Sequence, residues 1–513
     1  MFQAIRRFPL LFLGLVALVP RLYQLNSPLI GIHSWRQADT AAIARNFYAI
    51  PLTLSQLTQF FYPQVDWGGG AAAETEFPLY PAIVSGLYRL IGPQTAGARL
   101  VTVLFSLIGL YFLYRLIERS FNRSVAFWSA LFYAILPTSV FYGRTVQPES
   151  LVMMGTLGGL YFFKRWTDGE KGRDLLLSWI LSVIATLTKV LPLVYLGIPL
   201  LFLATTKYKV RIFRRLDLWI YAISLLGVTF AWYYHAHQIY LDTGLTFGFW
   251  SASTNRYRWI ELLSFQFWSD ILLRLIVRHF AIFGFIVVLI GLSYQRQKVE
   301  DYLWEVGLVS SLLANAIAPT SSYIHEYYQL PTVLYSLVFV GKVYSRTFTT
   351  ASTPSFTQQP ANRKISPRLL KAALVLTFIA GSLIYAIDYM SLEAADSSEV
   401  YYLSTQIQKH TPADSKVLAT TQSDPTLLYL ANRKGWLISP GEISAKRLSA
   451  ARKQGADFLV GSYEVVQSYV PFEDEAQKEK VRSLLSDLSK NSPSAACKPL
   501  VNDERIFIAP LCE

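Results

Sequence analysis

The polar segment 31–45, directly after the first long hydrophobic run, carries the side chains best suited to chemistry. It places one carboxylate, Asp39, among His33, Arg36 and Gln37, and of these His33 and Gln37 are candidate contacts for a substrate or a metal ion. Ionisable groups at the boundary of a very apolar protein are costly to keep, so they mark places where chemistry or transport happens. A carboxylate kept ionised by a nearby cation can accept a proton from an acceptor hydroxyl. Asp39 is therefore a candidate general base, and an ion pair with Arg36 on the same helix face is the structural alternative.

A second acidic motif contains Glu74 and Glu76 and follows the glycine run 68–70. Glycines permit close backbone approach and a mobile loop. Glu76 lies just before an expected helix, where the helix dipole favours a carboxylate. Two interpretations stay open: Glu76 caps this helix, or it contacts a substrate or a divalent metal ion.

Two cationic candidates lie at turns between hydrophobic runs. Arg144, in the turn 143–148, offers a forked guanidinium that suits a phosphate group. Glu149 starts the next expected helix, where it is either a helix cap or a ligand for substrate or metal. Lys189 lies at the turn of a helical hairpin, where it is either an anchor that reaches the membrane surface or a ligand.

The last motif, 323–331, gathers His325 and Glu326 with three tyrosines, one of which is Tyr328. Tyrosines are expected at a membrane–water boundary, where they form an aromatic belt. The belt does not account for the adjacent histidine and glutamate. His325, Glu326 and Tyr328 are therefore candidate contacts for a substrate or a metal ion.

The composition places these motifs in a polytopic α-helical membrane protein. Of the 513 residues, 52% are hydrophobic and 16% are charged, and the mean hydropathy is +0.32. A soluble core cannot hide that much apolar surface. The net charge of +13 comes from short basic clusters between apolar runs, which is typical of loops facing anionic lipid and argues against nucleic-acid binding. The sequence also lacks glycine-rich nucleotide motifs and the Cys/His spacing of a zinc site.

Hydrophobic runs of about 17 to 25 residues predict about eleven transmembrane helices. With a cytoplasmic N-terminus, every large basic cluster falls inside, as the positive-inside rule requires, and the first run becomes a retained signal anchor. The segment 78–92 is short and is expected to lie along the membrane surface instead of crossing it. The expected spans are 8–25, 98–117, 124–142, 149–165, 174–188, 190–206, 217–235, 279–295, 302–319, 328–345 and 369–388.

This topology gathers the polar motifs on the outer side, in the segments 26–97, 143–148, 236–278 and 320–327. The tail also lies outside, so the chain is expected to consist of a transmembrane domain, 1–390, and a small extracytoplasmic α/β domain, 391–513. Within the tail, the residue patterns predict helices at 400–409 and 426–432 and strands at 416–420 and 458–461. The segment 347–367, rich in Ser, Thr, Pro and Gln, is expected to be a disordered inner loop.

The only two cysteines, Cys497 and Cys512, both lie in the tail. An oxidising exterior would allow a disulfide that closes the last segment. Two free buried thiols are the alternative.

The order and sidedness of these motifs resemble the GT-C class of integral-membrane glycosyltransferases, and within it the protein O-mannosyltransferase and lipid A aminoarabinose-transferase superfamily (glycosyltransferase family 39-like). The resemblance covers about residues 1–390. It rests on Asp39 with 41–45, on 76–80, on Arg99 and Leu100, on Gly143, Arg144 and Glu149, on 187–189, and on 327–331.

The resemblance implies a GT-C fold and a catalytic carboxylate, Asp39, that deprotonates the acceptor and gives inversion at the sugar carbon. It also implies cationic side chains that hold the donor phosphate, for which Arg144, Lys189 and Arg45 are candidates. The implied partners are a polyprenyl-phosphate-linked sugar, membrane lipid and an extracytoplasmic acceptor, which is a lipid, a glycan or a protein. The implied location is the inner (cytoplasmic) membrane. No cofactor is certain, and a divalent metal ion stays open.

Two functions from other classes are alternatives. A transporter or flippase for a lipid-linked sugar would show inverted repeats and polar groups near the bilayer midplane, and the sequence shows neither. A non-catalytic membrane scaffold would make the polar loop motifs dispensable.

Overall fold

The computed structural model describes residues 7–247, 258–349, 367–393, 398–464, 475–491 and 498–512. The chain forms two compact units. The first comprises Met1–Tyr23, Leu100–His237 and Gly248–Tyr389, and the second comprises Gln24–Arg99, Gln238–Phe247 and Met390–Glu513. Most of the expected disordered loop 347–367 lies outside the described residues.

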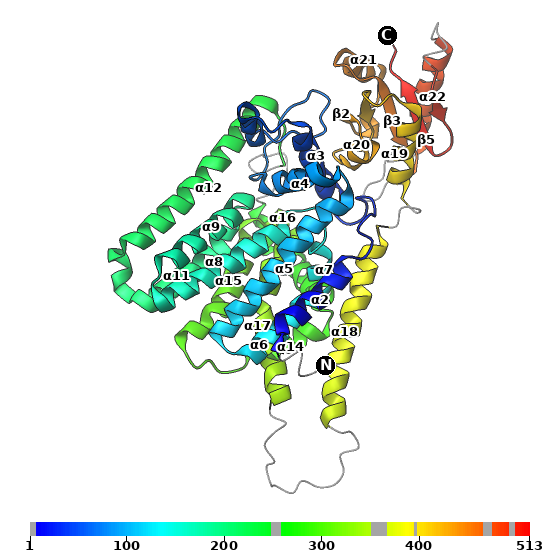
Figure 1. Ribbon diagram of the computed structural model, residues 1–513. Coiled ribbons are helices and arrows are strands. Elements are labelled where there is room, and N and C mark those ends of the chain that lie inside the picture. Colours follow the sequence, from blue (N-terminus) through cyan, green and yellow to red (C-terminus); the bar gives the residue numbers. More distant parts are fainter. Residues whose placement is uncertain are drawn as a thin grey trace. The chain divides into compact units, whose positions relative to one another are not determined.

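The first unit is helical throughout its described part, and each of the expected spans falls on a helix or on a pair of helices (Figure 1). Its helices are α2 (Pro9–Arg21), α5 (Thr95–Ser120), α6 (Arg123–Ile135), α7 (Pro137–Tyr142), α8 (Glu149–Gly169), α9 (Gly172–Thr188), α10 (Pro192–Tyr195), α11 (Gly197–Tyr208), η2 (Lys209–Arg214), α12 (Leu216–Thr243), α13 (Phe265–Arg274), α14 (Phe283–Leu292), α15 (Leu303–Ile317), α16 (Pro319–Ile324), η7 (Glu326–Gln329), α17 (Leu330–Thr349) and α18 (Pro367–Ser391).

Several expected spans are interrupted, and proline causes the clearest break. The span 124–142 is divided into α6 and α7, because Pro137 has no amide hydrogen to continue the helix and instead starts a new one. Among the described residues, three helices are long and apolar enough to cross a membrane: Thr95–Ser120, Pro192–Arg214 and Leu216–Thr243. The number of crossings and their orientation therefore stay predictions.

The second unit contains a five-stranded sheet with the order β2-β1-β3-β5-β4. Its strands are β1 (Lys416–Ala419), β2 (Lys434–Leu437), β3 (Phe458–Ser462), β4 (Val501–Asn502) and β5 (Ile506–Pro510). The first three pair in parallel, and β5 is antiparallel to both β3 and β4. The predicted strands at 416–420 and 458–461 are confirmed as β1 and β3, whereas the sequence patterns missed the other three.

Helices cover the sheet on both faces, because its buried strands alternate apolar side chains between them. Val417 and Ile508 pack toward α19 (Glu399–His410) and α20 (Thr426–Ala431). Leu418 and Phe507 belong to the opposite core, beside α21 (Ala445–Lys453) and α22 (Glu475–Asn491). The predicted helices at 400–409 and 426–432 are confirmed as α19 and α20. Cys512 is disulfide-bonded, and Cys497 lies outside the described residues, so their pairing stays a prediction.

The segment 24–99 belongs to the same unit as this sheet and pairs with its edge strand. The amide of Gly68 donates to the carbonyl of Gly435 over 2.8 Å, and the amide of Gly435 donates to the carbonyl of Asp66 over 3.1 Å. A Cβ on Gly68 would lie 2.6 Å from the ring of Trp436. The close backbone approach expected of the glycine run is therefore used here.

Three helices complete this segment: α3 (Ser34–Ala49), η1 (Leu54–Phe61) and α4 (Leu79–Ile91). The helix α4 corresponds to the expected surface segment 78–92. Its amphipathic pattern buries Tyr80, Val84 and Tyr88 on one face.

Candidate functional site

Asp39 lies in the middle of α3, in the second unit, with its side chain half-buried. Its carboxylate accepts no hydrogen bond and forms no ion pair with the residues that the structure describes. The three other carboxylates of the segment 24–99 all have partners. Glu76 pairs with Arg36, Asp66 pairs with Arg45, and Glu74 accepts a hydrogen bond from the hydroxyl of Thr246.

The alternative interpretation of Asp39 is an ion pair with Arg36. In the structure, Arg36 pairs with a different carboxylate. Arg36 forms its ion pair with Glu76, and its guanidinium lies 5.0 Å from the centre of the Phe247 ring. Glu76 is thus a partner of α3 as well as a residue near the start of α4. The Asp39 carboxylate is therefore within the electrostatic influence of the Arg36 cation without forming an ion pair with it.

Burial raises the pKa of Asp39 to about 8. The positive charge of Arg36 opposes this shift, whereas the negative charges of Asp424, Asp66 and Glu76 add to it. A carboxylate with a pKa near the working pH is a strong base once it is deprotonated. The environment of Asp39 is therefore suited to proton transfer near neutral pH.

Arg45 fixes the other end of α3. It pairs with Asp66, donates a hydrogen bond of 3.0 Å to the backbone carbonyl of Tyr429, and lies 4.7 Å from the centre of the Tyr429 ring. Asn46 donates to the carbonyl of Gln64 over 2.7 Å. Arg45 therefore has a structural role in this unit, and its role toward a phosphate stays a prediction.

The remaining candidates on α3 lie at its start. His33 is the residue that precedes the helix, and its backbone is left-handed, with a φ of 53°. Gln37 is fully buried and donates a hydrogen bond of 3.3 Å to the carbonyl of Ile32. Gln37 thus ties the start of the helix carrying Asp39 to the turn before it, and His33 is the left-handed residue of that turn.

A second polar cluster, in the first unit, is centred on Lys189. Its ammonium group pairs with Glu149, which is 3% exposed and starts α8. The same nitrogen lies 4.4 Å from the centre of the Tyr327 ring and 5.1 Å from that of Tyr328. The Oε2 atom of Glu149 is buried and has no hydrogen-bond partner among the described residues. Lys189 is thus held over two aromatic rings by one oxygen of a buried carboxylate.

Glu326 is the most fully bonded candidate of the first unit. It accepts hydrogen bonds of 2.9 Å from the hydroxyls of Tyr142 and Tyr389 and pairs with Arg278 at 2.8 Å. The ring of His325 stacks on Tyr327 with a centroid distance of 5.2 Å. Sequence reasoning missed Arg278, and no local signal would have found it because it lies 48 residues away.

The turn 143–148 contains three fully buried polar side chains, Arg144, Thr145 and Gln147. Both amide atoms of Gln147 lack a hydrogen-bond partner in the part of the chain that the structure describes. Buried polar atoms are rarely left unbonded in a native protein, so this amide is suited to a polar ligand or to water. The sequence analysis missed Gln147, although its place beside Arg144 in a short polar turn is a usable signal.

The candidate carboxylates do not assemble a metal site within the described ranges. No group of three or more His, Cys, Asp or Glu side chains lies close enough there to hold a metal ion. Glu76 and Glu149, two of the metal candidates, are each paired with a cation. A divalent metal ion therefore stays a prediction without support from a ligand set.

The comparisons with known proteins concern a family model, curated sequences and solved structures. A family model described as dolichyl-phosphate-mannose-protein mannosyltransferase matches residues 75–235. No curated protein sequence matches the chain. The structure of ArnT from Cupriavidus metallidurans bound to undecaprenyl phosphate is similar, with a TM-score of 0.61, 13% identity, and coverage of 98% of both chains.

Two further solved structures share the arrangement. The archaeal oligosaccharyltransferase AglB from Archaeoglobus fulgidus, in complex with an inhibitory peptide and a dolichol-phosphate, has a TM-score of 0.57 at 12% identity, covering 90% of this chain and 70% of that one. The arabinofuranosyltransferase AftD from Mycobacteria has a TM-score of 0.53 at 14% identity, covering 98% of this chain and 41% of that one.

Proposed function

We propose that this chain, whose fold is that of the GT-C glycosyltransferases, transfers a sugar from a polyprenyl-phosphate donor to an acceptor outside the cytoplasm. Two similar structures support the donor class, because ArnT binds undecaprenyl phosphate and AglB is in complex with a dolichol-phosphate. A lipid donor is also consistent with the described helices that are long and apolar enough to cross a membrane.

The observation that carries this proposal is the state of Asp39. It is the one carboxylate of the segment 24–99 with no bonded partner among the described residues, and burial raises its pKa to about 8. In the proposed reaction, Asp39 takes the proton from the acceptor hydroxyl or amine as that group attacks the anomeric carbon. The bond from this carbon to the phosphate oxygen breaks, the configuration inverts, and polyprenyl phosphate leaves with the bonding electron pair.

A leaving phosphate develops negative charge, which positive groups stabilise in the transition state. We assign this role to Arg144 and Lys189. The ammonium of Lys189 is partly exposed beside two tyrosine rings, so it can turn from Glu149 toward a phosphate oxygen. The unbonded amide of Gln147 supplies a further donor next to Arg144 in sequence.

The test uses the full chain in liposomes with a panel of radiolabelled undecaprenyl-phosphate monosaccharides and a membrane extract as the acceptor source. We expect one donor to lose its label to the acceptor fraction, and Asp39→Asn to slow this transfer by about 10²- to 10⁴-fold, the usual contribution of a general base. Asp414→Asn is the matched control, because Asp414 is an exposed carboxylate of the same unit.

Two outcomes would replace the proposal. Movement of the intact labelled donor across the bilayer, without loss of its sugar, would identify a transporter. Full transfer by the Asp39→Asn variant would remove Asp39 from the reaction and with it the proposed mechanism.

A further inference from the structure

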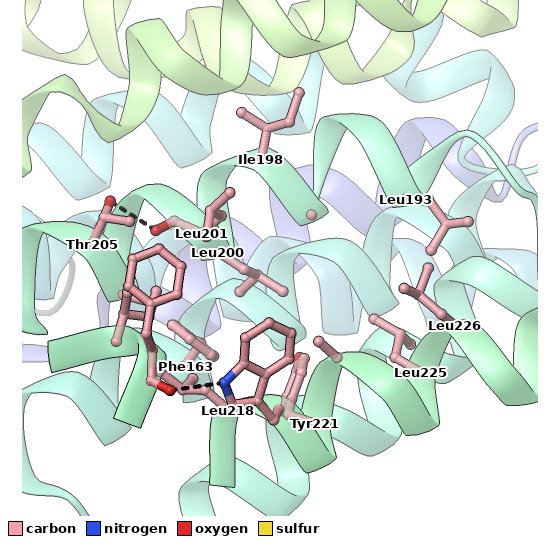
Figure 2. Close-up of a pocket in the computed structure, with 16 residues that line it drawn as sticks. Phe163, Leu193, Ile198, Leu200, Leu201, Thr205, Leu218, Tyr221, Leu225 and Leu226 are labelled. Atoms are coloured by element: carbon pink, nitrogen blue, oxygen red, sulfur yellow. Dashed lines mark hydrogen bonds between the residues drawn. The ribbon is translucent and has the colours of Figure 1, made fainter. Parts of the chain in front are cut away.

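A large apolar cavity lies between α11 and α12 in the first unit, with a volume of about 630 Å³ (Figure 2). Binding sites for small organic ligands usually have volumes of about 300 to 1,000 Å³. Leucine and isoleucine side chains from both helices line the cavity. The lining includes Leu193, Ile198, Leu200, Leu201, Leu225 and Leu226.

Hydrogen bonds to α9 hold α12 in the position that leaves this space. The hydroxyl of Tyr221 lies 3.0 Å from that of Ser178 and 2.7 Å from that of Ser182. Further along the same two helices, the hydroxyls of Thr229 and Thr186 lie 2.8 Å apart. The polar atom of Tyr221 is thus satisfied by α9, which leaves its ring as part of the apolar lining. The cavity is a built feature of the unit.

The cavity opens onto a surface suited to hydrocarbon. Leu201 and Leu226, one from each helix, are 57% and 53% exposed. Both helices belong to segments that are long and apolar enough to cross a membrane. Exposed leucines on such segments are suited to contact with lipid chains, so the cavity is suited to a hydrocarbon chain.

One end of the cavity is bordered by unpaired positive charge. Ile212 and Phe213 line the cavity from η2, the segment that joins α11 to α12. Four basic side chains in or beside this segment are exposed and form no ion pair or hydrogen bond with another described residue: Lys207, Lys209, Arg211 and Arg214. Arg215, by contrast, is paired with Glu170 and Asp217.

Trp219 marks this end as a membrane–water boundary. Its ring lines the cavity, and its indole nitrogen donates a hydrogen bond of 3.2 Å to the carbonyl of Phe213. Tryptophan is enriched at such boundaries because one part of its ring system is apolar and the other donates a hydrogen bond.

The basic end of the cavity lies far from the candidate phosphate residues of the same unit. Glu149, which pairs with Lys189, starts α8, whereas Glu170, which pairs with Arg215, directly follows the last residue of that helix. A helix of 21 residues is about 30 Å long, which is the thickness of a hydrocarbon layer. The basic end of the cavity therefore lies at the opposite end of α8 from the Lys189 cluster, which corresponds to the opposite leaflet.

We propose that this cavity binds one anionic phospholipid, with an acyl chain between α11 and α12 and the phosphate of the headgroup among the four unpaired cations. Such a lipid would fill a space that otherwise separates α12 from α11. Basic side chains beside a membrane attract headgroups of net negative charge, which favours an anionic phospholipid over a neutral or zwitterionic lipid. The inference is independent of the sugar-transfer reaction.

The test uses the full chain purified in detergent and native mass spectrometry with equal amounts of phosphatidylglycerol and phosphatidylcholine. We expect one phosphatidylglycerol per chain to be retained in preference to phosphatidylcholine. Arg211→Gln with Arg214→Gln should weaken this retention by about tenfold or more, because each basic side chain near the surface contributes to binding. Lys171→Gln with Arg173→Gln is the matched control, since it removes two exposed cations that follow α8 and leaves the four cations in and beside η2 unchanged.

A second measurement locates the acyl chain. In nanodiscs that contain phosphatidylglycerol brominated on its acyl chains, the fluorescence quenched in the wild type and not in Trp219→Phe reports lipid beside Trp219. Gly197→Leu should abolish this quenching, because Gly197 lines the cavity and a Cβ there meets no atom within 4 Å.

Three outcomes would overturn the proposal. They are equal retention of phosphatidylcholine, unchanged retention by the Arg211→Gln and Arg214→Gln variant, and displacement of phosphatidylglycerol by an equal amount of undecaprenyl phosphate. The last would make the cavity a site for the donor lipid.

Discussion

Arg45 donates a hydrogen bond of 3.0 Å to the backbone carbonyl of Tyr429, which joins the end of α3 to α20 beside the C-terminal sheet. The two residues are 384 positions apart in the sequence. Asp424, in the turn that precedes α20, contributes negative charge that raises the pKa of Asp39 on the same helix as Arg45. The C-terminal part of the second unit therefore helps to set the electrostatic environment of Asp39.

The first prediction concerns the pH dependence of sugar transfer. A general base acts when it is deprotonated, and burial raises the pKa of Asp39 to about 8. We therefore expect kcat/KM to rise with pH through neutrality and to level off above a pH of about 8. Steady-state measurements of kcat/KM between pH 5 and pH 9, in steps of about one pH unit, bracket that pKa and test this expectation. A rate that stays constant over this range, as expected for an aspartate with an ordinary pKa of about 4, would contradict the assignment.

The second prediction concerns the charges around Asp39. Asp424→Asn removes a negative charge that raises the pKa of Asp39, so the midpoint of the pH–rate curve should move to lower pH. Arg36→Gln removes the positive charge that lowers this pKa, so the midpoint should move to higher pH. Asp414→Asn serves as the control and should leave the midpoint unchanged. Opposite signs for the first two variants are required; shifts in the same direction would show that the effect is structural.

The third prediction concerns stability and follows from the same raised pKa. Between pH of about 4 and about 8, Asp39 is ionised in the unfolded chain and protonated in the folded one, so stability falls as pH rises through this window. Asp39→Asn cannot ionise and should lose this dependence. Its melting temperature should exceed that of the wild type at pH 8 by at least about 2 °C and match it at pH 4. Equal melting temperatures at both pH values would contradict a buried, neutral Asp39.

Local patterns predicted the helices best. The amphipathic pattern that predicts a helix at 400–409 lies entirely within that segment, and the helix found there is Glu399–His410. The edge strand Lys434–Leu437 was missed because its Gly435 and Trp436 give no alternating pattern. Its place in the sheet depends on β1 and on the segment 66–68, which are distant in sequence.

The sequence predicts the residues of the candidate site better than it predicts their contacts. Asp39 was selected from its surroundings in sequence, but its lack of a partner depends on Arg36, which pairs with Glu76 forty residues later. The pair of Lys189 with Glu149 spans the same sequence distance. Such pairs arise from packing of separate helices, which a single sequence does not encode in any local spacing.

The fourth prediction concerns the close packing of Gly435, in the edge strand β2, against β1. A Cβ on Gly435 would overlap the backbone oxygen of Val417, an atom that cannot move without disturbing β1. Gly435→Ala should therefore destabilise the protein by about 1 to 3 kcal/mol, as overpacking of a core does. In Gly441→Ala, the nearest atom would be 3.8 Å away, so this control should be close to neutral. Denaturant titration of the two variants measures the difference, and equal effects would contradict the close packing.

The fifth prediction concerns Lys189 and Glu149. Because Glu149 is 3% exposed, Lys189→Met leaves a buried carboxylate without its cation. Removing one partner of a buried pair costs about 3 to 5 kcal/mol, whereas replacing both costs less. We therefore expect Lys189→Met to lower the melting temperature strongly and the double variant with Glu149→Gln to restore much of it. If Lys189 also binds the donor phosphate, the double variant will fold well and still show a raised KM for the lipid-linked sugar. A double variant with normal KM would leave Lys189 with a structural role alone.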